Sequence, residues 1–159
     1  MNTKALRIVT LIVFLINVIL IFLVDLFTIE MIPDGTSGNG NPADILWFVE
    51  LPMYLLLLAG IALIVHRERY LVQYNRVRVL LILLVFFAVS VLLQVDKAQR
   101  IRDQIDGRIT EFGWLNQYTN TIYINFYSFL SGILLLLLIQ TVVTLIRNRF
   151  YRASKPDKK

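Results

Sequence analysis

The sequence predicts an all-α integral membrane protein, a four-transmembrane-helix bundle with up-down-up-down topology. Hydrophobic residues make up 57% of the 159 residues, and the mean hydropathy is +0.68. Soluble domains typically contain roughly 45–50% apolar residues. The apolar residues also gather in four long runs, each close to the roughly 20 residues that a helix needs to cross a bilayer. We therefore expect one transmembrane domain over residues 1–152 and a basic tail over residues 153–159.

The first two predicted spans cover residues 8–27 and 45–65. The first run is too long for the apolar region of a signal peptide, and no small-residue cleavage site follows it, so we expect a retained helix. Glycine, asparagine and proline cluster between the two runs, over residues 33–42, which is typical of a loop. The second run carries Pro52 near its start, where a helix tolerates proline.

The third and fourth predicted spans cover residues 79–95 and 121–146. Apolar residues continue at helical spacing from residue 101 to residue 112, which predicts an amphipathic extension of the third helix beyond the membrane. We expect this extracytoplasmic extension to break at Gly107 and Gly113. Two pairs of opposite charge four residues apart would support it: Asp96 with Arg100, and Arg102 with Asp106.

The distribution of basic residues predicts the orientation. Four spans place both termini on the same side as the basic connection over residues 66–78. Of the 16 Lys and Arg residues, only four fall on the opposite side: Lys97, Arg100, Arg102 and Arg108. The positive-inside rule then predicts cytoplasmic termini. The high isoelectric point is thus a topology signal, and we expect no nucleic-acid partner. We predict a bacterial cytoplasmic membrane as the location.

Polar residues within the spans are the first candidates for function, because an unpaired polar group in a bilayer is costly. One predicted set lies at the outer end of the bundle and comprises Asp25, Glu50, Gln94, Asn125 and Tyr127. These residues either lie hydrated at headgroup depth or line a shallow cavity that binds a cation, a proton or a lipid headgroup. Glu50 is the strongest candidate because it lies deeper than Trp47, a predicted interfacial anchor.

A second set of small and polar residues predicts helix packing. It comprises Asn17, Ser90, Ser128 and Gly132. Ser128 and Gly132 form a small-xxx-small pair, which permits close approach of helices. A continuous hydrophilic pathway is the alternative interpretation, but it is interrupted by Leu135, Leu136 and Ile139.

The leading functional prediction is a non-enzymatic helical subunit of a membrane complex or homo-oligomer. Its partners would be the lipid bilayer and either further copies of itself or other membrane subunits. The chain has no cysteine and a single histidine, His66, so we expect no metal site, no cofactor and no catalytic residues. One alternative is a small ion channel or transport component with a polar outer mouth. A second is a membrane-embedded lipid-modifying enzyme with Asp25 and Glu50 as its acid/base pair.

Overall fold

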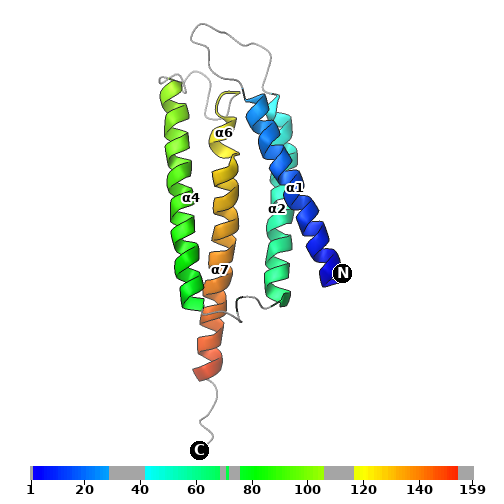
Figure 1. Cartoon of the computed structure of the whole chain (residues 1–159), viewed down its shortest axis with the longest axis vertical. Coiled ribbons are helices and arrows are strands. Elements are labelled where there is room, and N and C mark those ends of the chain that lie inside the picture. Colours follow the sequence, from blue (N-terminus) through cyan, green and yellow to red (C-terminus); the bar gives the residue numbers. More distant parts are fainter. Residues whose placement is uncertain (1, 29–41, 69–70, 72–75, 106–116, 154–159) are drawn as a thin grey trace, which may run out of the picture.

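The computed structural model describes residues 2–28, 42–68, 71, 76–105 and 117–153, with side chains up to residue 147. Over these residues the chain is helical and contains no strand. The elements, in chain order, are α1 (Thr3–Phe27), α2 (Ala43–Glu68), α4 (Arg76–Gln104), α6 (Asn120–Tyr123) and α7 (Phe126–Ala153) (Figure 1).

Four helices are long and apolar enough to cross a membrane, with mean hydropathies between 2.3 and 2.9 over their most apolar stretches. They run alternately up and down (Figure 1). The predicted fold class is therefore confirmed, and the chain is a multi-pass membrane protein. We call the end of the bundle with both termini the termini end. The opposite end, where α1 ends and α2 begins, is the cavity end.

The helices form two closely packed antiparallel pairs, α1 with α2 and α4 with α7, and the two pairs meet mainly through α2 and α7. Gly60 allows the close approach of α1 and α2, because a Cβ at this position would collide with the Thr10 hydroxyl. Ion pairs lie near both ends of the bundle. Arg7 pairs with Glu68 between α1 and α2, and Lys97 lies 3.9 Å from Asp25 between α4 and α1.

The apolar core lies where the two helix pairs meet. Ile21, Leu57 and Phe129 are buried there, and they come from α1, α2 and α7. The ring of Phe129 lies 5.8 Å from that of Phe14 and 5.3 Å from that of Tyr54, which are ordinary distances for interacting aromatic rings. By contrast, many large apolar side chains of α4 are exposed, as expected for a surface that contacts lipid.

The extension of the third helix is confirmed as helix as far as Gln104, since α4 continues from the predicted span without a break to that residue, and residues 106–112 lie outside the described residues. Asp96 and Arg100 form the predicted ion pair, with 2.7 Å between Oδ2 and a guanidinium nitrogen. Ile105 follows the helix and is buried, with 2% of its surface exposed. Asp106, Gly107 and Gly113 lie outside the described residues, so the second pair and the two predicted breaks stay predictions.

Hydrogen bonds between helices involve few side chains. Ser90 on α4 donates to the carbonyl of Tyr127 at 3.0 Å and shares a hydrogen bond with the Ser131 hydroxyl at 2.8 Å. Gln140 on α7 donates to the carbonyl of Ala62 on α2 at 3.2 Å. Asn17 is buried, but its amide donates within α1, to the Val13 carbonyl.

Gly132 generates the first testable prediction, because a Cβ there would collide with the hydroxyl of Tyr54. Alanine is a better helix former than glycine, yet we expect Gly132→Ala to destabilise the bundle by roughly 1–3 kcal/mol through overpacking. Unfolding in detergent, followed by circular dichroism, measures this. Adding Tyr54→Phe removes the colliding atom and should restore part of the loss.

The matched control for Gly132→Ala is Ala88→Leu on the exposed face of α4. This larger substitution should leave the midpoint of the unfolding transition unchanged. Equal destabilisation by both substitutions would show that the contact between Gly132 and Tyr54 is not specific.

Candidate functional site

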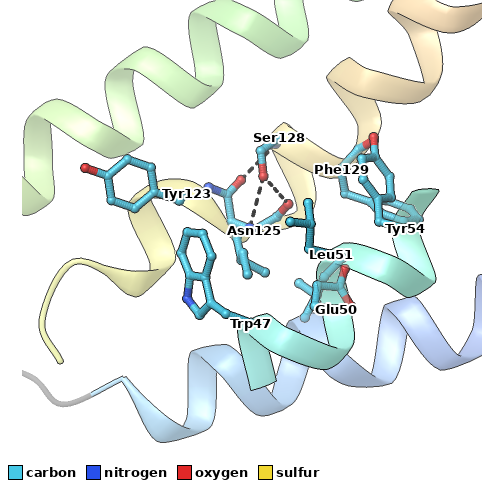
Figure 2. Close-up of a pocket in the computed structure, with 10 residues that line it drawn as sticks. Trp47, Glu50, Leu51, Tyr54, Tyr123, Asn125, Ser128 and Phe129 are labelled. Carbon is cyan, nitrogen blue, oxygen red and sulfur yellow. Dashed lines mark hydrogen bonds between the residues drawn. The ribbon is translucent and has the colours of Figure 1, made fainter. Parts of the chain in front are cut away.

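A cavity of about 210 Å³ lies between α2 and the junction of α6 and α7, and Ile21 of α1 also borders it (Figure 2). The wall formed by α2 includes Trp47, Glu50 and Tyr54, and the opposite wall includes Tyr123, Asn125 and Phe129. Apolar and aromatic groups with few polar atoms are typical of a small-molecule site. The cavity lies toward the cavity end of the bundle, above the apolar core.

Among the residues that the structure describes, Glu50 is the one charged residue that lines this cavity. Only 5% of its surface is exposed, and its Oε2 atom is buried without a hydrogen-bond partner. Glu50 is the eighth residue of α2, so it lies about 10 Å along the helix axis from Ala43, at a rise of about 1.5 Å per residue. An isolated buried carboxylate is unfavourable unless a proton or a cation neutralises it.

Four aromatic side chains line the same cavity as Glu50. The rings of Trp47 and Tyr123 lie 5.7 Å apart in an edge-to-face arrangement, and the rings of Tyr54 and Phe129 lie 5.3 Å apart. The Tyr54 hydroxyl donates to the Phe129 carbonyl at 2.7 Å, which fixes this ring at the contact between the helix pairs. The indole Nε1 of Trp47 is buried without a hydrogen-bond partner.

Asn125 separates α6 from α7 and satisfies both helix ends. Its Oδ1 accepts from the backbone N–H groups of Tyr127 at 2.8 Å and Ser128 at 3.1 Å, as an N-cap residue does. Its Nδ2 donates to the carbonyls of Thr121 at 2.8 Å and Ile122 at 3.3 Å. The Ser128 hydroxyl accepts from the Asn125 N–H at 3.1 Å, and it donates to the Asn125 carbonyl (Figure 2).

The structure brings only part of the predicted outer polar set to the cavity. Glu50 and Asn125 line the cavity together. Asp25 does not line it, because its carboxylate is 68% exposed and lies near Lys97. Gln94 donates to the Ile122 carbonyl, and Tyr127 uses its backbone groups to bond Ser90 and Asn125. An acid/base pair of Asp25 and Glu50 is therefore not assembled in this cavity.

The aromatic part of the site is absent from the sequence-based predictions. Those predictions include Trp47 only as an interfacial anchor, and they do not associate Tyr54 or Phe129 with Glu50. A signal was present, since Trp47, Glu50 and Tyr54 are three and four residues apart and so share one face of α2. Among the described residues, no group of three or more His, Asp or Glu side chains could hold a metal ion.

Comparison with known protein families, with curated proteins and with solved structures found no match to this chain.

Asn125 provides the second prediction, because its side chain bonds two helix ends at once. Asn125→Ala should destabilise the protein by about 2 kcal/mol, the upper range for loss of an N-cap, since buried carbonyls of α6 also lose their donor. Thermal unfolding in detergent measures the loss.

Asn125→Asp separates the two roles of this side chain. It keeps the acceptor for the α7 amides and removes the donor to α6, so an intermediate stability is expected. Wild-type stability of both variants would contradict the structural role of Asn125.

Proposed function

We propose that this protein is a small membrane transport component that binds a cationic solute at Glu50, in the cavity between its two helix pairs. The observation that supports this most directly is the buried side chain of Glu50, which lines the cavity and has a carboxylate oxygen without a hydrogen-bond partner. Ionisable groups inside membrane domains are rare and commonly mark the paths of substrates, ions or protons.

A positive solute fits the cavity better than a negative or neutral one. Removing the partner of a buried charge is strongly destabilising, so an ionised Glu50 calls for a cation close to its carboxylate. The nearby polar groups do not supply one. Asn125, Ser128 and Tyr54 have hydrogen-bond partners within the chain and carry no charge.

The packing below the cavity favours a carrier over an open pore. Ile21 and Phe129 line the cavity and also belong to the buried core cluster, together with Leu57. This core therefore blocks the path of a solute from Glu50 to the termini end of the bundle. The contact between α2 and α7 is slight compared with the packing inside each helix pair, so a rocking motion of one pair against the other would open this path.

The interruption at Asn125 also supports transport. Binding sites in many transporters are formed by discontinuous membrane helices at the interface of two structural halves. Here the break between α6 and α7 borders the cavity directly, and the cavity lies between two helix pairs. If the termini are cytoplasmic, as the basic residues predict, then the cavity belongs to the outer half of the membrane.

Assembly into a homo-oligomer or a larger membrane complex stays a prediction, as do the bacterial origin and the single-domain boundaries. The lipid-modifying enzyme is not proposed, because Asp25 does not reach the cavity.

Reconstitution into liposomes tests the proposed function. Charge displacement on a solid-supported membrane should follow concentration jumps of at least one cation from a panel of Na⁺, K⁺ and choline. Glu50→Gln should abolish the response, because it removes the charge that binds the cation while keeping the shape of the side chain.

Asp103→Asn is the control, since Asp103 is an exposed acidic residue of α4 outside the cavity, and its currents should equal those of wild type. A folded wild-type protein that responds to no cation of the panel would refute the proposal. So would a response that Glu50→Gln leaves intact.

A further inference from the structure

We infer that the solute is an organic ammonium ion, held between the Glu50 carboxylate and the aromatic walls of the cavity. This inference rests on the proposed function and specifies its substrate class. The aromatic walls comprise Trp47, Tyr54, Tyr123 and Phe129, and they contribute from both α2 and the α6–α7 junction. The inference therefore depends on a carboxylate and several aromatic rings that meet at one cavity (Figure 2).

Aromatic rings favour an organic cation because their faces carry negative electrostatic potential. The attraction is strongest for tryptophan and increases when the site is desolvated, and aromatic cages of this kind recognise quaternary ammonium groups. The carboxylate supplies the full countercharge in the same cavity. Methyl groups on the nitrogen would contact the apolar surface of Leu51 and Phe129, which an inorganic ion cannot use.

A bare inorganic cation fits this cavity poorly. Hard cations such as Ca²⁺ take six to eight oxygen ligands, and Mg²⁺ keeps a near-octahedral shell. Among the described side chains that line the cavity, only Glu50 has a buried oxygen without a partner, and Asn125 Oδ1 already accepts two backbone hydrogen bonds. The Ser128 hydroxyl is likewise engaged with the backbone of Asn125.

The size of the cavity sets the size of the ligand. A volume of about 210 Å³ admits a small organic cation. Choline, a trimethylammonium ion with a short hydroxyethyl chain, is of this size. Figure 2 shows the indole nitrogen of Trp47 on the side of the ring away from Glu50, so this donor does not oppose a cation beside the carboxylate.

The fluorescence of Trp47 provides a direct binding measurement. The chain has two tryptophans, and Trp114→Phe leaves Trp47, which lines the cavity, as the sole reporter. Full-length protein carrying this change, in detergent, is titrated with choline and with 3,3-dimethylbutan-1-ol, its neutral isostere. We expect a saturable change with choline and affinity weaker by about tenfold or more for the isostere, since only choline interacts with the carboxylate and ring faces as a charge.

Two pairs of variants test whether choline binding depends on the carboxylate and on the aromatic rings. Glu50→Gln should weaken choline binding by about tenfold or more, whereas Asp103→Asn should leave it unchanged. Tyr123→Leu should weaken it several-fold and Tyr123→Phe should retain it, because only the latter keeps an aromatic face. The Tyr123 pair keeps the inference testable if Glu50→Gln fails to fold.

Three outcomes would overturn the inference. Equal affinity for choline and its isostere would indicate a neutral ligand. Choline binding that survives Glu50→Gln would remove the carboxylate from the site. Absence of choline binding, together with Glu50-dependent currents for Na⁺ or K⁺, would refute the ammonium ligand and leave the proposed transport function standing. Absence of both would refute both.

Discussion

The structure depends above all on the absence of water around the four apolar helices, which forces polar groups to find partners inside the chain. Several span hydroxyls meet this requirement within their own helix: Thr10 donates to the Leu6 carbonyl, Thr141 to Leu137 and Thr144 to Gln140. Ser90 and Gln140 meet it across helices. Among the described buried side chains that depart from this rule, Glu50 is the one ionisable group, so its unpaired carboxylate oxygen requires a functional explanation.

The same requirement explains how a helix can be interrupted beside the cavity. Ending α6 and restarting α7 leaves backbone carbonyls and amides without their helical partners. One asparagine side chain supplies an acceptor to α7 and donors to α6, so the interruption is possible without water. The interruption places Tyr123 on α6, where its ring meets Trp47 of α2, while Phe129 of α7 meets Tyr54. Asn125 thus acts on the cavity by positioning its aromatic walls.

Some features of this structure can be predicted from the sequence, and others cannot. The composition and the lengths of the apolar runs predict the four spans. The order of these spans along the chain predicts their alternating direction. They do not determine which way a residue faces around a helix. Asp25 and Glu50 both lie toward the cavity end, yet Asp25 is exposed near Lys97 while Glu50 faces inward. Tyr123 and Phe129 belong to the site only because α6 and α7 pack against α2, and that contact leaves no local pattern.

The unpaired atoms of the interior favour positive charge well beyond the cavity. In the described part of the chain, four buried side-chain oxygens lack partners, one from each membrane helix: Asn17 Oδ1, Glu50 Oε2, Gln94 Oε1 and Gln140 Oε1. The single unpaired donor is Trp47 Nε1. Each of these oxygens attracts the positive end of a water molecule or a cation. The buried oxygens of the bundle therefore favour positive charge, as the Glu50 carboxylate does.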